Sequence, residues 1–386
     1  MLAVLAPGQG SQKPGFLTPW LALPGAEARL RWWSALAGLD LVHLGTEADA
    51  DEIRDTARTQ PLLVAAALLA AEHLPMADVA LVAGHSVGEL AAAAMAGVIT
   101  PEAAIALASV RGREMAAACA LEPTGMCAVL GGDATEVLAA IEAAGLYPAK
   151  RNGAGQVVVA GAADRIERFA AQPPTRARVV ALKVAGAFHT PFMAPAEKAL
   201  ITLAGGITTA TPTRILLSNR DGAAVDDGPV MLERLVRQVT APVRWDLCMA
   251  TMADLGVTAM IELAPAGTLM GLAKRACKGV EIIGVNTPDD LAGARDTIAR
   301  HGGAPTHEPH PQFRVVVSPA AGTFQPDTDL AEGAGVRNGQ VLGQINTRQG
   351  QVAVTAHNAG VLTEWLASAD DPVTQGQPLV RLGEPA

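Results

Sequence analysis

The feature that most restricts the fold of this chain is a glycine-flanked serine between an apolar run and an alanine-rich run. Residues 84–88 read Gly-His-Ser-Val-Gly, directly after the short apolar segment 79–83 and before a helix-forming stretch. This G-x-S-x-G pattern between a strand and a helix places a nucleophilic serine on a sharp turn at the end of a parallel strand. We therefore expect an α/β fold with a parallel sheet. The alternative is a glycine-rich turn whose serine only caps the helix.

A second pattern lies between about residues 122 and 187, where strand and helix candidates follow the order β-α-β-β-α-β. This order is typical of a ferredoxin-like fold. Buried strands are expected again further along the chain, so we interpret the segment as a ferredoxin-like subdomain inserted into a hydrolase-like parallel-sheet core. The expected strands are 126–130, 147–151, 157–161, 179–184, 261–263 and 282–285, and the expected helices within the insertion are about 133–144 and 164–171. Before the serine motif, a buried helix is expected from about Leu62 to Glu72, directly after Thr-Gln-Pro at 59–61.

A break in composition divides the chain. Residues 301–311 hold three histidines and three prolines without any apolar period, which is typical of a linker. The segment 312–386 beyond it is rich in strand candidates and repeats itself, since 336–345 matches 373–382 at an offset of 37 residues. Two similar strand sets predict a small all-β domain after a first domain of residues 1–300.

Composition and charge exclude several classes of protein. The net charge of −9 argues against the broad basic face of a nucleic-acid binder. The four cysteines lack paired short spacings and are expected to be free thiols, with no zinc site and no disulfide. The strongest apolar run, 62–71, is about half of a membrane span, and the N-terminus lacks the pattern of a signal peptide. We therefore expect a soluble, cytoplasmic protein that binds neither metal nor membrane.

A nucleophilic serine needs a base, and the sequence offers eight histidines. Three of them lie in the expected linker, where a solvated loop residue is more common than a metal ligand. His85 adjoins the serine, but neighbouring side chains on a turn diverge, which indicates a structural role. His189 lies where the inserted subdomain rejoins the core, at a natural cleft edge. From the residues alone, an ordinary loop histidine is still the more common interpretation of His189.

Seven motifs occur in an order that resembles a known enzyme family. They are Gly-Gln-Gly-Ser-Gln at 8–12, Thr-Gln-Pro at 59–61, Gly-His-Ser-Val-Gly-Glu at 84–89, Val-Arg-Gly-Arg at 110–113, the segment 152–161, Gly-Ala-Phe-His at 186–189, and Val-Arg-Gln-Val with Pro-Val-Arg-Trp between 236 and 245. Over residues 1–300 the chain resembles the malonyl-CoA:acyl carrier protein transacylases, whose domain is also embedded in fatty-acid and polyketide synthases.

The resemblance implies a nucleophile and a base. Ser86 would attack malonyl-CoA with His189 as general base, and the malonyl-serine ester would then pass its acyl group to the phosphopantetheine thiol of acyl carrier protein. The partners would be malonyl-CoA and acyl carrier protein, in fatty-acid or polyketide biosynthesis. The resemblance further implies that carbonyl groups near Gln238 orient the histidine and that the amides of Gln9 and Val87 form the oxyanion hole.

The resemblance also implies how the substrate is chosen. Arg111 matches the arginine that binds the free malonyl carboxylate, although an isolated arginine on a helix is ordinarily a solvated charge. Phe188 would occupy the room that an α-methyl group needs, which favours malonyl over methylmalonyl. Gln60, Asn152 and Gln238 would support the site, and no cofactor is implied.

Residues 312–386 resemble the biotinyl/lipoyl carrier domains through Ser-Pro-Ala-Ala-Gly-Thr-Phe at 318–324 and the repeated Val-x-x-Gly-Gln-x-Leu elements. Such domains carry their modified lysine on a hairpin between the two halves, here at 345–350. Gln349 takes the lysine position, and the segment 312–386 contains no lysine. We therefore expect no covalent biotin or lipoate, and a structural role or docking of an unidentified protein.

The same residues also fit other functions. An acyl-thioester hydrolase would use the same serine with water as the acceptor, and a malonate decarboxylase component would load a dedicated carrier. A non-catalytic scaffold is disfavoured because Ser86, Arg111 and His189 are all present.

Overall fold

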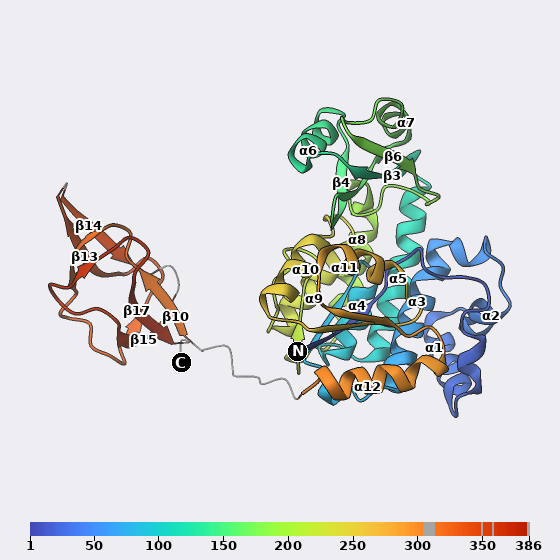
Figure 1. The fold of residues 1–386 in the computed structure, drawn as a ribbon, viewed down its shortest axis with the longest axis horizontal. Helices are drawn as coiled ribbons and strands as arrows, with labels where there is room; N and C mark the ends of the chain where they lie inside the picture. Colours follow the sequence, from blue (N-terminus) through green and yellow to red (C-terminus); the bar gives the residue numbers. More distant parts are fainter. Residues whose placement is uncertain (304–312, 349, 357–358, 384–386) are drawn as a thin grey trace. The chain divides into compact units, whose positions relative to one another are not determined.

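The structure is a computed structural model that describes residues 1–303, 313–348, 350–356 and 359–383. The chain forms two compact units, Met1–Thr306 and His307–Ala386, each with a hydrophobic core of its own. The first unit combines helices with two sheets, and the described part of the second consists of strands and loops (Figure 1).

A five-stranded sheet of order β7-β2-β1-β8-β9 forms the centre of the first unit, and all of its pairings are parallel. Alternate residues of the first strand face different cores, because Val4 belongs to the larger apolar cluster and Leu5 to the smaller one. Strands covered on both faces need continuous apolar runs, as this sequence has. The strands are β1 (Leu2–Ala6), β2 (Leu81–Gly84), β7 (Ile215–Leu216), β8 (Ala259–Glu262) and β9 (Glu281–Gly284).

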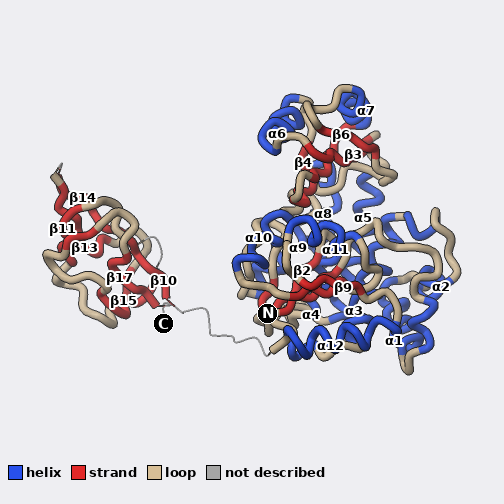
Figure 2. The backbone as a smooth tube through the Cα atoms, viewed as in Figure 1, coloured by secondary structure: helices blue, strands red, loops and turns tan. Residues whose placement is uncertain are grey.

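Helices surround this sheet (Figure 2). Those that contribute buried residues to the larger core are α1 (Ala26–Ala37), α2 (Leu41–Thr46), α3 (Thr56–Glu72), α4 (Gly88–Met95), α5 (Pro101–Cys119), α8 (Ala194–Ala204), α9 (Gly228–Arg237) and α12 (Leu291–His301). Those of the smaller core are α10 (Trp245–Asp254) and α11 (Thr268–Ala276). Short 3-10 turns occupy Thr18–Ala22, Glu52–Arg54, Met76–Asp78, Pro191–Met193 and Pro288–Asp290.

Two expected boundaries are wrong. Helix α3 begins six residues before Leu62, because the Asp55 side chain accepts a hydrogen bond from the amide of Ala57, so the Thr-Gln-Pro motif lies inside the helix. Helix α12 includes His301, which is the first residue of the expected linker. The rest of that linker from residue 304 lies outside the described residues.

The inserted subdomain is a four-stranded antiparallel sheet of order β4-β5-β3-β6 with two helices, which is the ferredoxin-like arrangement. It lies at the top of Figure 1, above the helices that cover the core sheet. The last strand ends at Ala181, so the expectation of a strand through Val184 is wrong. The elements are β3 (Thr124–Gly131), α6 (Ala134–Ala143), β4 (Tyr147–Gly153), β5 (Gln156–Ala162), α7 (Ala163–Ala171) and β6 (Ala177–Ala181).

The second unit is a sandwich of two four-stranded sheets, with orders β10-β17-β15-β12 and β14-β13-β11-β16. The sequence repeat maps onto the two sheets, since β12 and β13 occupy the first copy and β16 and β17 the second. Gln349 lies outside the described residues. The strands are β10 (Phe313–Val317), β11 (Gly322–Pro326), β12 (Gly335–Val336), β13 (Val341–Thr347), β14 (Gly350–Thr355), β15 (Gly360–Trp365), β16 (Pro372–Val373) and β17 (Pro378–Gly383).

All four cysteines are free thiols, and three of them are buried. Burial raises the pKa of the Cys119 and Cys127 thiols to about 11. Among the described residues, no helix has the length and apolarity that a bilayer crossing requires, and no three side chains of the metal-binding types are gathered as ligands.

Candidate active site

The serine of the G-x-S-x-G motif lies on a sharp turn between β2 and α4. Ser86 has a φ of 56°, in the left-handed region that L-residues rarely adopt. The flanking glycines are required by close backbone contacts: a Cβ atom at Gly84 would lie 2.0 Å from the carbonyl oxygen of Gly88, and one at Gly88 would lie 2.3 Å from that of Ala6. The turn therefore presents the hydroxyl of Ser86 beyond the end of the strand.

His189 lies opposite this serine. Its Nε2 is 2.7 Å from Ser86 Oγ, and its Nδ1 is 2.9 Å from the backbone oxygen of Gln238. A carbonyl oxygen only accepts, so Nδ1 carries the proton and Nε2 accepts from the serine hydroxyl. The arrangement is that of a nucleophile and its general base, with a backbone carbonyl in place of the usual carboxylate.

The surroundings of His189 favour its neutral form. Burial has the largest effect and lowers the pKa of the imidazole well below 6.5, and the positive charges of Lys150 and Arg111 lower it further. An imidazole that stays neutral can take the serine proton when the substrate arrives.

Arg111 reaches the serine from α5. Its guanidinium donates to Gln60 Oε1 at 2.5 Å, to Gln238 Oε1 at 2.8 Å and to Ser86 Oγ at 3.4 Å. Only 2% of the residue is exposed, and burial lowers the pKa of the guanidinium to about 10, so it stays charged at neutral pH. A buried cation held by two neutral amides is prepared to bind an anionic group.

Gln238 connects these groups. Its side-chain nitrogen donates to the backbone oxygen of Ser86 at 3.1 Å and to Asn219 Oδ1 at 3.3 Å, and it also donates to the Glu89 carboxylate. Burial raises the pKa of Glu89 to about 7. Since the backbone carbonyl of Gln238 also orients the histidine ring, this residue contacts both Ser86 and His189.

A cavity of about 360 Å³ opens onto Ser86, Arg111 and His189. Four of its lining residues are cations, and none of the described residues that line it is acidic, although the whole chain is acidic. Such a cavity attracts anionic ligands. Its lining also includes Gln9, Gln60 and Phe188 among the residues expected from sequence. The cations are Arg54, Arg111, Lys150 and Lys183.

Two further expected groups are backbone amides. The N–H groups of Gln9 and Val87 have no hydrogen-bond partner in the described part of the chain. Val87 is the residue next to the nucleophile, and it is 1% exposed. Unpartnered amides beside a serine nucleophile are the donors that an oxyanion needs.

Asn152 is not part of the reacting cluster. Its Oδ1 lies 3.0 Å from Nε2 of His85, and its amide nitrogen donates to Gln156 Oε1 at 3.0 Å. His85 in turn packs edge-on against Trp245. The contact between His85 and Asn152 therefore ties the serine turn to strand β4 of the inserted subdomain.

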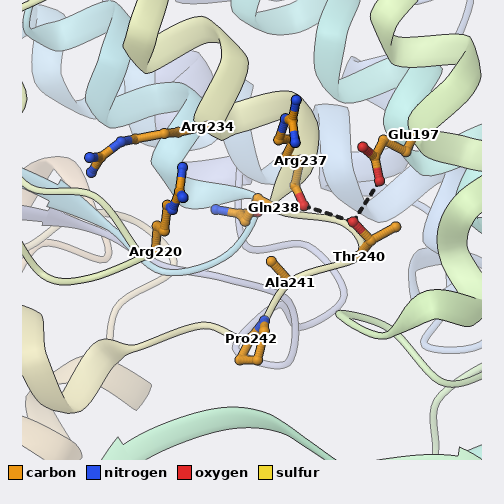
Figure 3. A pocket seen from close by; sticks show the side chains of 8 residues that line it. All are labelled: Glu197, Arg220, Arg234, Arg237, Gln238, Thr240, Ala241 and Pro242. Atoms are coloured by element: carbon orange, nitrogen blue, oxygen red, sulfur yellow. Dashed lines mark hydrogen bonds between the residues drawn. The ribbon is translucent and has the colours of Figure 1, made fainter.

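A second hollow lies on another side of Gln238 (Figure 3). Two of its three arginines pair with acids, Arg234 with Asp221 at 2.9 Å and Arg237 with Glu233 at 2.9 Å. Figure 3 shows Thr240 beside Glu197, whose carboxylate accepts a hydrogen bond from the threonine hydroxyl at 2.6 Å. The lining of this hollow therefore includes an acid, Glu197, whereas none of the described residues that line the cavity at Ser86 is acidic.

Three polar residues of the site were not predicted from the sequence. Glu89 belongs to the serine motif and was visible there as an acid in the first turn of a buried helix. The other two residues lie in segments without a recognisable motif. Asn219 Oδ1 accepts a hydrogen bond from the Ser86 amide at 2.8 Å, and Lys150 lines the cavity.

Comparisons with known proteins agree with this geometry. Residues 5–297 match the family model described as an acyl transferase domain, and residues 314–382 match the model described as a biotin-requiring enzyme. The malonyl CoA-acyl carrier protein transacylase of Mycobacterium bovis is 56% identical over 296 residues, which cover 75% of this chain and 98% of the relative. The Escherichia coli protein of the same name is 33% identical, over 76% of this chain and 98% of its own length.

Solved structures give the same result. The crystal structure of MCAT from Mycobacterium tuberculosis is 55% identical with a TM-score of 0.75, covering 76% of this chain and 99% of that one. A type II PKS acyl-carrier protein in complex with its malonyl-transacylase matches with a TM-score of 0.71 and 30% identity, over 77% of this chain and 99% of that chain.

Proposed function

We propose that this chain, which belongs to the acyl transferase family and within it to the malonyl CoA-acyl carrier protein transacylases, moves a malonyl group from malonyl-CoA to the phosphopantetheine thiol of an acyl carrier protein. The observation that carries the proposal is the 2.7 Å contact between Ser86 Oγ and His189 Nε2 at a cavity lined by cations and by no acid among its described residues.

In the first half-reaction, Ser86 attacks the thioester carbonyl while its proton passes to Nε2 of His189. The carbonyl oxygen becomes an oxyanion, which the N–H groups of Gln9 and Val87 stabilise, an effect of about 3 kcal/mol per donor in comparable sites. The carbon–sulfur bond then breaks, and the histidine returns its proton to the leaving sulfur. The products are a malonyl-serine ester and free CoA.

In the second half-reaction, the phosphopantetheine thiol gives its proton to His189 and its sulfur attacks the ester carbonyl. The bond between the carbonyl carbon and Ser86 Oγ breaks, and the serine oxygen recovers the proton. The enzyme returns to its starting state, and the malonyl group is bound to the carrier as a thioester.

Substrate choice rests on the residues around the serine. Arg111 binds the free malonyl carboxylate, and its hydrogen bonds to Gln60 and Gln238 hold it in place. Phe188 lines the cavity and restricts the room beside the α-carbon of the acyl group, which favours malonyl. Asn152 supports the site through His85.

Intact-protein mass spectrometry after mixing with malonyl-CoA tests the proposal. We expect a malonyl adduct that a holo carrier protein removes, and no adduct in Ser86→Ala. Ser109→Ala is the matched control, since Ser109 is a buried serine whose hydroxyl donates to the carbonyl of Ile105 in its own helix. A wild-type protein with neither adduct nor turnover would refute the proposal, and rapid release of malonate without a carrier would instead indicate a hydrolase.

The second unit carries the biotinyl/lipoyl-like domain without a site for the cofactor. The segment 312–386 contains no lysine, and attachment of biotin or lipoate needs a lysine amine. We propose that this domain is unmodified and serves for docking of another protein, and that the enzyme works in the cytoplasm, where CoA thioesters are made.

A further inference from the structure

Lys150 is held at the junction between the inserted subdomain and the core. It lies on β4, and the residues on both sides of it bond to one residue of the loop that follows α9. The Val243 amide donates to the oxygen of Ala149 at 2.9 Å, and the Arg151 amide donates to the oxygen of Val243 at 2.9 Å. The backbone at Lys150 is therefore anchored to the loop that begins at Gln238.

The Lys150 side chain differs from the other cations of the cavity. Arg54 pairs with Asp51 at 2.5 Å, Arg111 is held by two glutamines, and Lys183 is exposed. Lys150 is partly buried, and its ammonium has no partner among the described residues. Burial and the nearby charge of Arg111 lower its pKa to about 8. Two cations in the lining of one cavity, one of them unpaired, repel each other until an anion binds between them.

We propose that Lys150 is a specificity-determining residue that shares the free carboxylate of the malonyl group with Arg111. The inference rests on the proposed function. A carboxylate has two oxygens with about four acceptor sites, so it can bind a guanidinium and an ammonium together. Two N–H groups of Arg111 already donate to Gln60 and Gln238, so the guanidinium has fewer N–H groups for the carboxylate. Acceptor sites on the carboxylate therefore stay available for a second cation. An acetyl group carries no charge and gains nothing from either cation.

The test compares malonyl-CoA with acetyl-CoA in Lys150→Met, which removes the charge and keeps most of the side-chain length. The rate of acyl-serine formation is measured for both substrates by quenched-flow mass spectrometry. We expect kcat/KM for malonyl-CoA to fall about 10- to 100-fold, as for loss of a hydrogen bond to a charged group, and kcat/KM for acetyl-CoA to change less than about threefold. Lys150→Arg, which keeps a positive charge, should retain part of the malonyl preference.

Lys198→Met on the exposed surface of α8 is the matched control and should leave both rates unchanged. Equal losses on both substrates in a folded Lys150→Met protein, or no loss on either, would overturn the inference. If thermal melting shows that Lys150→Met is unfolded, Lys150→Gln provides the same comparison. The wild-type adduct with malonyl-CoA is measured in the same experiment, so a failure of the proposed function is recognised separately.

Discussion

The proposed nucleophile and the proposed base both extend from strained backbone. Ser86 and His189 have φ angles of 56° and 61°, a conformation that costs an L-residue about 1–2 kcal/mol. The hydrogen bond from the Ser86 amide to Asn219 and that from the His189 ring to Gln238 hold the two residues in place. Surrounding bonds thus maintain a geometry that the isolated residues would not adopt.

The protonation of His189 predicts the pH dependence of the first half-reaction. Only the neutral imidazole can act as base, and its lowered pKa means that this form persists below pH 6.5. We expect the acid limb of kcat/KM for malonyl-CoA to lie well below pH 6.5. In Lys150→Met the limb should move to higher pH, because one of the charges that lower the histidine pKa is gone. The charged and titratable groups that act on this histidine are His85, Arg111 and Lys150.

A pH series of single-turnover rates measures the acid limb of the wild type and that of Lys150→Met. An acid limb at pH 6.5 or above in the wild type would contradict the neutral, buried imidazole.

Arg111 predicts a selective loss of activity. Arg111→Ala should lower kcat/KM for malonyl-CoA about 100-fold or more, since a charge-assisted bidentate contact disappears, while acetyl transfer is retained. Arg111→Lys keeps the charge without the planar fork and should give an intermediate loss. Competition between malonyl-CoA and acetyl-CoA in one reaction measures the ratio directly. Equal loss on both substrates would refute the carboxylate role.

At the scale of elements, the turn between β2 and α4 depends on the absence of two side chains. Gly88→Ala would push a Cβ atom against the backbone oxygen of Ala6, which cannot move without shifting β1. We expect a loss of about 2 kcal/mol or more in the free energy of unfolding, typical of overpacking. Urea denaturation of the full chain measures it.

Gly293→Ala is the control for this substitution. Gly293 is an exposed residue of α12, and outside its own stretch of helix no atom of the described residues lies within 4 Å of the added Cβ. In a helix interior, replacing glycine with alanine should stabilise by up to about 1 kcal/mol. A Gly88→Ala protein as stable as this control would show that the turn tolerates a side chain.

Elements with a local signature could be predicted from the sequence. The serine turn, the β-α-β-β-α-β order of the insertion and the repeated strands of the second unit all follow from patterns within a few dozen residues. The early start of α3 was missed because the capping by Asp55 outweighed the proline at position 61. The end of β6 was predicted too late because the apolar sequence continues to Val184, whereas the pairing with β3 ends at Ala181.

The contacts within the site required the tertiary structure. Ser86, Arg111, His189 and Gln238 were predicted individually, and the fold places them within hydrogen-bonding distance of one another. Lys150 carried no motif of its own, and only the folded chain brings its charge close to Arg111. The hydrophobic periodicity of a sequence predicts helices and strands, and it contains no information on which distant charges the fold brings together.

At the scale of the whole molecule, the chain joins a unit that matches the acyl transferase domain to a unit that matches the biotin-requiring enzymes and contains no lysine. Full-length protein produced together with biotin and lipoate ligases should show no added mass on residues 312–386, because no lysine is present there. Gln349→Lys is the matched control, since it places an amine at the position where related domains carry one. A mass gain on the wild-type second unit would contradict the prediction, and peptide mapping would locate it.

The buried thiols have a practical consequence for measuring this enzyme. Burial raises the pKa of all four cysteines, so their reactive thiolate forms are scarce at neutral pH. Free CoA released in the first half-reaction carries an exposed thiol of ordinary reactivity. A thiol-reactive dye added to the native enzyme with malonyl-CoA should therefore react with the released CoA and not with the cysteines. Since each acylated serine releases one CoA, the amplitude of the initial burst should equal the concentration of active enzyme.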